Sequence, residues 1–154
     1  LLVIAYEDIG LGNPAALART LDAIDAAKRV GFPEGMIPLS VAVIDLALSP
    51  KSRSACEAIH SAMEEVAAGS VPVPRYLRYT PTGLSEQDRY PYDRPDLWHR
   101  IQYLPDALKT KVFYQPQTSS AYEKQLAAND QALKQIRRSS DLASLKQAKK
   151  PRQQ

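Results

Sequence analysis

The side chains that could do chemistry in this 154-residue chain are few and widely spaced. His60 and His99 lie far apart, and neither has a cysteine or a set of carboxylates at the spacing of a metal site. The single cysteine, Cys56, stands in no recognisable catalytic context, so we expect a half-buried structural thiol. No glycine-rich loop ending in Gly-Lys-Ser/Thr is present, which excludes nucleotide binding by that device. The chain is therefore predicted to hold no metal or cofactor and not to be an enzyme by itself.

Acidic residues at two places need a structural or a chemical explanation. Glu7 and Asp8 stand together at the end of an apolar segment, where they could cap backbone donors or act as a general acid and base; we favour capping. Asp45 lies inside an apolar stretch and needs a partner if it is buried. Lys51, Arg53 or another arginine could supply that partner, and we favour an ion pair over a catalytic acid.

The longest apolar stretch, residues 35–50, is the element that the other helices are expected to surround. Between Met36 and Leu48 only Ser40 and Asp45 are plainly polar. The stretch is too long for an ordinary strand and too short to span a bilayer. An apolar run of this kind predicts a central helix that is buried on all sides.

Cap and stop residues predict three further helices. Asn13-Pro14 offers a cap followed by proline at the first helical position, which predicts a helix over residues 14–30 that stops at a glycine. Ser49-Pro50 repeats this pattern and predicts a helix over residues 51–67. A last helix is predicted over residues 121–138. The apolar face expected for the second of these helices consists of Ala55, Ile59, Ala62, Met63 and Val66.

Residues 70–118 have a different composition. They hold seven of the twelve prolines, six of the eight tyrosines and the only tryptophan. Low-complexity linkers lack this density of aromatic residues. We therefore expect an ordered but mostly irregular segment whose rings hold it against the helical core, with short helical turns near residues 75–79 and 106–109.

The net charge of +3 is unevenly distributed. Residues 134–152 carry +6, which leaves the remainder near −3. Such a basic end could contact nucleic-acid phosphates, or it could be a solvated, frayed terminus with residues 139–154 forming a mobile tail. The candidate DNA contacts are Lys134, Arg137, Arg138, Lys146, Lys149 and Lys150.

The beginning of the chain is apolar and has no capping residue, which suggests a helix cut from a longer protein. No basic-then-apolar signal segment opens the chain, and no apolar run is long enough to cross a membrane. A single cysteine fits a reducing compartment.

Short motifs in a fixed order resemble the RarA/MgsA family of replication-associated AAA+ ATPases, relatives of the eukaryotic Werner-helicase-interacting protein. The resemblance covers roughly residues 1–138. The motifs that carry it are Glu7-Asp8-Ile9-Gly10-Leu11, Val30-Gly31-Phe32-Pro33-Glu34, Leu46-Ala47 with Pro50-Lys51-Ser52, Val73-Pro74 with Leu77-Arg78, Tyr90-Pro91-Tyr92, Gln102-Tyr103-Leu104-Pro105-Asp106, Phe113-Tyr114-Gln115-Pro116 and Tyr122-Glu123. Departures from the family pattern occur at Tyr6, Arg53, Gln87-Asp88-Arg89 and Asp93.

The resemblance implies an all-α domain, related to clamp-loader collars, that follows the ATPase core and lid. Residues 1–138 would form this C-terminal oligomerisation domain and assemble a homotetramer. The parent would be a DNA-dependent ATPase that acts at stalled or gapped replication forks and associates with single-strand-binding protein in the bacterial cytoplasm, near the nucleoid. Its Walker motifs, ATP and Mg would belong to an upstream domain.

Three functions follow for the chain itself. The first is an oligomerisation and scaffold domain, whose interface would include Tyr90, Tyr92, Trp98 and Tyr103. The second is a DNA-contacting module built on the basic C-terminal helix and tail. The third, an independent enzyme, lacks any convergent nucleophile, base or metal set.

Overall fold

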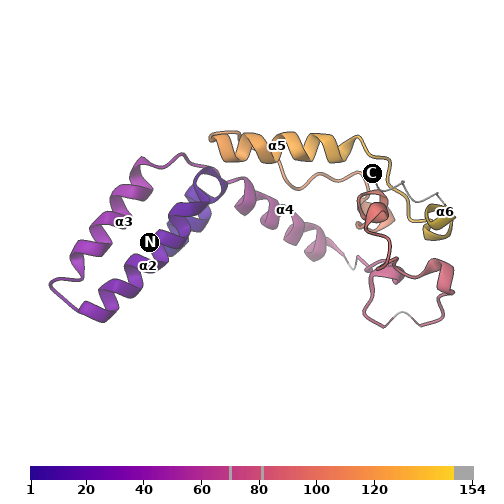
Figure 1. The fold of residues 1–154 in the computed structure, drawn as a ribbon, viewed down its shortest axis with the longest axis horizontal. Coiled ribbons are helices and arrows are strands. Elements are labelled where there is room, and N and C mark those ends of the chain that lie inside the picture. Colours follow the sequence, from indigo (N-terminus) through magenta and orange to yellow (C-terminus); the bar gives the residue numbers. More distant parts are fainter. Residues whose placement is uncertain (70, 81, 148–154) are drawn as a thin grey trace. The chain divides into compact units, whose positions relative to one another are not determined.

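The computed structural model describes residues 1–69, 71–80 and 82–147. Its regular elements within these ranges are helical (Figure 1), which confirms the all-α prediction. The chain divides into two compact units. Unit 1 comprises Leu1–Glu64 and Val112–Asn129, and unit 2 comprises Glu65–Lys111 and the residues from Asp130 onward.

Unit 1 is built from long helices. A short helix α1 (Leu2–Ile4) continues into a π-helical turn η1 (Ala5–Ile9) and a 3₁₀ turn η2 (Gly10–Gly12). The antiparallel hairpin of α2 (Pro14–Val30) and α3 (Met36–Leu48) follows, and both helices occupy the predicted residues (Figure 1). The next helix, α4 (Ser54–Ala68), begins in unit 1, and α5 (Ala121–Lys134) returns to it.

The core of unit 1 is small and lies between η1, α2 and α3. Its buried residues are Ala5, Ile9, Ala16 and Leu46, with Leu17 packed against them. The prediction that α3 is buried on all sides is wrong for this chain, because only Ala42 and Leu46 of that helix are buried. The hairpin partner α2 covers one face of α3, and the opposite apolar face remains exposed among the described residues.

Close backbone packing explains why α4 begins at Ser54 and not at Lys51 as predicted. A Cβ on Gly12 would lie 2.2 Å from the Pro50 carbonyl oxygen, and one on Gly10, whose φ is +44°, would lie 2.7 Å from that of Ser52. The Ser52 amide also donates a 2.9 Å hydrogen bond to the Asp8 carbonyl. These contacts hold residues 50–53 outside the helical conformation.

The expected side-chain cap at Asn13 is absent. Asn13 does lie at the N-cap position of α2, but its side chain makes no capping hydrogen bond. Its Nδ2 atom donates instead to Ser49 Oγ at 2.9 Å. The residue therefore joins the start of α2 to the end of α3.

Unit 2 consists mainly of short turns. These are η3 (Arg75–Leu77), η4 (Glu86–Asp88), η5 (Pro95–Arg100) and η6 (Asp106–Leu108), joined by extended segments and completed by the helix α6 (Leu142–Gln147). Turns were predicted near η3 and η6. The only bridge found in the described residues pairs Ile101 with Ser139.

Unit 2 has a core of its own, and the expectation that the rings hold the irregular segment against the helical core stays a prediction. Leu97 and Ile101 of the irregular segment are buried against Leu142 and Leu145 of α6, with Tyr76 and Tyr90 packed on them. Residues 142–147 lie in the predicted mobile tail, yet they form a packed helix because these two leucines are buried. The predicted domain boundary after residue 138 stays a prediction, and residues 148–154 lie outside the described ranges.

Two helices show other departures from the predictions. The expected apolar face of α4 is not a packed face, since Ile59, Met63 and Val66 are all exposed. The last long helix, α5, ends at Lys134, four residues before the predicted end.

Candidate functional site

The exposed face of α3 is a regular apolar surface. Ile37, Val41, Ile44 and Leu48 follow one another at spacings of four, three and four residues, which places them on one side of the helix. All four are exposed, from 59% for Ile44 to 81% for Leu48. We call these four residues the α3 stripe. A contiguous exposed apolar patch of this kind is typical of an interaction surface.

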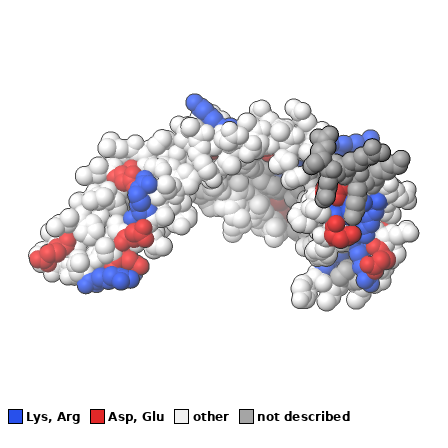
Figure 2. Space-filling model, viewed as in Figure 1, with Lys and Arg blue, Asp and Glu red and all other residues white. Residues whose placement is uncertain are grey.

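The charged residue within α3 does not belong to the stripe. Asp45 accepts two hydrogen bonds from Arg19 of α2, at 2.7 and 3.0 Å. Hydrogen bonding to Arg19 holds the pKa of Asp45 below its usual value. The interpretation of Asp45 as a structural ion pair is consistent with this geometry, and the partner is Arg19, not Lys51 or Arg53. Asp45 is the only charged residue of α3. Figure 2 shows how acidic and basic side chains are distributed over one face of the molecule.

The acidic pair at the start of the chain is also an ion-pair partner. Arg53 donates to Glu7 Oε1 at 2.8 Å and to Asp8 Oδ1 at 2.7 Å. These hydrogen bonds raise the pKa of Arg53. The favoured prediction of backbone capping is therefore wrong, because both carboxylates bind a side chain from the segment before α4.

A buried carboxylate that sequence reasoning missed ties α5 to this segment. Glu123 is completely buried, and its Oε1 atom accepts hydrogen bonds from Ser52 at 2.9 Å, Ser54 at 2.5 Å and the Gln117 amide at 3.1 Å. Burial raises the pKa of Glu123, but hydrogen bonds from Ser54, Ser52 and the backbone outweigh burial and lower it. The serine three residues before the glutamate was the available signal, since Ser120 caps the Glu123 amide as in a capping box.

The four aromatic residues predicted as an interface lie in unit 2, and the structure brings three of them together. The rings of Tyr90 and Tyr92 are 4.8 Å apart, and the hydroxyls of Tyr90 and Tyr103 are 2.8 Å apart. Burial raises the pKa of Tyr90 to about 12, with a further contribution from Tyr103. Trp98 instead donates its indole N–H to the Pro91 carbonyl at 3.1 Å. Their role as an interface stays a prediction.

Some of the basic residues predicted to contact DNA bind groups of the chain itself, and others are exposed. Lys134 pairs with Asp130 at 2.6 Å, and Lys146 donates to the Glu86 carbonyl at 2.8 Å. Arg137 and Arg138 are exposed. Lys149 and Lys150 lie outside the described residues, so no geometry bears on them.

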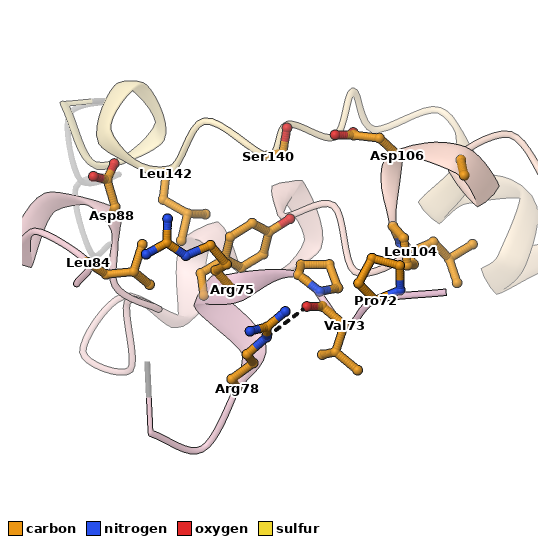
Figure 3. Close-up of a pocket in the computed structure, with 14 residues that line it drawn as sticks. Pro72, Val73, Arg75, Arg78, Leu84, Asp88, Leu104, Asp106, Ser140 and Leu142 are labelled. Atoms are coloured by element: carbon orange, nitrogen blue, oxygen red, sulfur yellow. Dashed lines mark hydrogen bonds between the residues drawn. The ribbon is translucent and has the colours of Figure 1, made fainter. Parts of the chain in front are cut away.

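Several cavities open on the described residues of unit 2, and two of them are bordered by both arginine and tyrosine side chains. The larger, of about 520 Å³, is bordered by proline and leucine side chains with Arg75 and Arg78 among them (Figure 3). Arg78 Nε donates to the Val73 carbonyl at 3.2 Å, and Arg75 donates to the Thr82 carbonyl at 3.0 Å. Asp88 and Asp106 also border this cavity, so its charges are balanced.

The second cavity, of about 480 Å³, is rich in aromatic and arginine side chains. We call it the tyrosine groove. Its aromatic and charged lining residues are Tyr76, Arg78, Tyr79, Glu86, Arg89, Tyr90 and Tyr92. No such groove was predicted, because these residues come from separate turns of an irregular segment.

The comparison with protein families decides where the chain belongs. A family model described as "MgsA AAA+ ATPase C terminal" matches residues 1–134. The chain belongs to this family. The resemblance found in the sequence motifs is thereby confirmed.

Two of the curated relatives described for this chain share a name from DNA replication and recombination. A "Replication-associated recombination protein A" of Bacillus subtilis is 48% identical over 133 residues, which are 82% of this chain and 32% of the relative. The protein of the same name from Coxiella burnetii is 37% identical over 121 residues, 73% of this chain and 28% of the relative. An uncharacterized AAA domain-containing protein of Mycobacterium tuberculosis is 33% identical over 143 residues, 88% of this chain and 31% of the relative. The chain thus spans about a third of the length of these relatives.

Little in the described part of the chain resembles a reaction centre. Cys56 is half-buried, and its Sγ atom lies 3.7 Å from Nδ1 of the exposed His60. Within the described residues, no group of three or more histidine, cysteine or acidic side chains could hold a metal ion. In the same residues, no helix has the length and apolar character to span a membrane. The α3 stripe and these two cavities of unit 2 are candidate binding surfaces.

Proposed function

We propose that this chain is the self-association and scaffold domain of a replication-associated recombination ATPase that acts on DNA. The observation that carries the proposal is the α3 stripe, an exposed apolar surface on the helix whose composition predicts complete burial. A helix of this composition is stable in water only when another element covers its apolar faces. The α2 helix covers one face, and a second copy of the chain would cover the other.

Three properties of the α3 stripe support a second copy as its occupant. The spacing of four, three and four residues is that of a coiled-coil seam, in which knobs of one helix enter holes of the other. The stripe itself contains no charged residue, so two identical stripes can face each other without like-charge repulsion. An isologous contact of this kind needs only one self-complementary surface per subunit.

The test is the solution mass of the chain by size exclusion with light scattering, over a range of concentrations. We expect a multimer for the unmodified chain. Ile44→Glu in the stripe places a charge at the seam and should yield monomers. Met63→Glu, the same kind of change on the exposed face of α4, is the matched control and should leave the mass unchanged.

Two results would overturn this assignment. One is a monomeric chain at every concentration. The other is dissociation by Met63→Glu while Ile44→Glu remains associated, which would move the contact to α4.

Tyr92→Ala and Trp98→Ala test the aromatic interface in the same way, because a loss of mass in these variants would assign the contact to unit 2.

The domain would act within a longer protein. We infer a collar-like homotetramer whose ATP- and Mg-dependent activity belongs to the parts of the relatives that this chain does not match. Its expected setting is the bacterial cytoplasm near the nucleoid, at stalled or gapped forks, with DNA and single-strand-binding protein as partners. The names of the relatives and the AAA+ family support this setting.

A second candidate function is DNA contact through the basic C-terminal end. The exposure of Arg137 and Arg138 favours it. Contacts from basic side chains to phosphates weaken steeply with salt and do not depend on the bases. Arg137→Gln with Arg138→Gln should therefore lower the salt dependence of DNA binding. Unchanged binding and salt dependence would dismiss this function.

A further inference from the structure

The tyrosine groove combines flat aromatic faces with guanidinium groups. Tyr79 is fully exposed and Tyr92 is 80% exposed. Both rings border the same cavity as Arg78 and Arg89. The chain has few aromatic residues outside this segment, so two exposed tyrosines at one cavity call for an explanation. Proteins bind unpaired nucleotides with aromatic rings that stack on the bases and with arginine side chains that lie beside them.

The groove keeps its rings in place through neighbouring contacts. Tyr92 packs at 4.8 Å against Tyr90, and Tyr90 is held by the hydroxyl of Tyr103. Tyr76, on the inner side, donates to the Gln102 carbonyl at 2.5 Å. Tyr92 therefore stands on a supported base, which reduces the conformational entropy that ligand binding would otherwise remove, whereas the Tyr79 ring is fully exposed beside it.

The arginines are placed to meet a backbone of negative charge. Arg78 uses only Nε, on the Val73 carbonyl, so both of its terminal nitrogens lack a partner among the described residues. Arg89 pairs with Glu86 at 2.9 Å, but both side chains are largely exposed, and a pair of this kind contributes little stability. A phosphate could therefore replace Glu86 as the partner of Arg89.

We propose that the tyrosine groove binds a single nucleic-acid strand, with bases stacked on Tyr79 and Tyr92 and phosphates bound by Arg78 and Arg89. The cavity volume of about 480 Å³ falls within the range of small-ligand sites. The groove thus accommodates a short stretch of unpaired nucleotides. This inference rests on the proposed function, because it assumes that the domain acts on DNA. It assigns the DNA contact to the tyrosine groove and not to the basic C-terminal end.

The test measures fluorescence anisotropy of a labelled oligothymidylate and of an abasic strand of equal length and charge, titrated with the whole chain. Stacking requires bases, so oligothymidylate should bind more tightly than the abasic strand. Tyr79→Ala and Tyr92→Ala should each weaken oligothymidylate binding by roughly fivefold to a hundredfold and leave abasic binding unchanged. Arg78→Gln should lower the salt slope for both strands by about 0.7.

Conservative and distant variants separate stacking from misfolding. Tyr79→Phe and Tyr92→Phe keep the rings and should keep the affinity. Tyr122→Ala removes an exposed tyrosine of unit 1 and should have no effect. Equal affinity for the abasic strand and oligothymidylate, or full affinity in both alanine variants, would overturn the proposal.

The solution mass of the same samples distinguishes this proposal from the proposed function. A chain that associates but does not prefer bases supports the scaffold and refutes the groove. A monomer that loses base-dependent binding in Tyr79→Ala supports the groove and refutes self-association through α3.

Discussion

The two units of this chain use different means to satisfy their backbones. In unit 1 the long helices α2 and α3 satisfy their own amides and carbonyls, so their side chains can form a regular apolar surface. In unit 2 the turns are short, and side chains bind main-chain carbonyls instead. Trp98 binds Pro91, Tyr76 binds Gln102 and Arg94 binds Lys146. The helical unit is suited to pack against another helix, whereas the irregular unit is suited to line cavities with side chains.

The cores of the two units also differ in the size of the side chains that they contain. The core cluster of unit 1 holds two alanines together with Ile9 and Leu46, and the backbone of this unit approaches itself closely at Gly10 and Gly12. The core cluster of unit 2 consists of large aliphatic residues, two from η5 and its end and two from α6. The packing of unit 1 therefore depends on close contact between backbone segments. The packing of unit 2 depends on large side chains that fill its core. The following predictions test this difference, starting from the largest expected effect.

Gly12→Ala should cause the largest loss of stability. The new methyl group would lie 2.2 Å from the Pro50 carbonyl oxygen, and a backbone clash of this kind should cost more than about 3 kcal/mol of unfolding free energy. Urea unfolding followed by circular dichroism at a fixed protein concentration measures this cost. Gly69→Ala is the matched control, because no atom lies within 4 Å of its added Cβ, and it should change stability by less than about 1 kcal/mol. An unchanged midpoint for Gly12→Ala would contradict the close approach of residues 10–12 to residues 50–52.

Leu142→Ala should destabilise unit 2 by about 2–4 kcal/mol, because it leaves a cavity among Leu97, Ile101 and Leu145. Hydrogen exchange should show faster exchange of the Gln102 and Ser139 amides, which pair with carbonyls across the bridge beside this core. Ala143→Gly, next to it on α6 but only half-buried, serves as a control for helix propensity. Normal protection of both amides in Leu142→Ala would show that α6 does not support the irregular segment.

Glu123→Gln should cost about 2 kcal/mol, because a neutral amide oxygen accepts weaker hydrogen bonds from Ser52 and Ser54 than a charged carboxylate does. The folded pKa of Glu123 is depressed, so its contribution is fully present above the pKa of the unfolded chain. That contribution is lost as the pH falls from about 4.3, the ordinary glutamate value, through the folded pKa. Urea unfolding at a series of pH values should show the unmodified chain and the variant converging in acid. If the two unfolding free energies differ by the same amount down to the lowest pH, Glu123 does not stabilise the fold through its charged form.

Local signals in the sequence determined the class of the fold and several of its elements. Proline at the first position and glycine after the last gave α2 its bounds, since both act on the backbone of the residue itself. The apolar run over α3 and the family motifs were also readable without coordinates. These features depend on neighbours along the chain, and a sequence contains that information directly.

Only the tertiary structure decided which side chains are covered and which groups meet. The composition of α3 predicted burial, but a single chain supplies one covering helix, so the α3 stripe stays exposed. Arg53 could have paired with Asp45, yet it binds Glu7 and Asp8, and Arg19 takes Asp45. The partners of Glu123 and the rings of the tyrosine groove come from distant turns. Such contacts depend on the path of the backbone through space, which no local pattern of residues specifies.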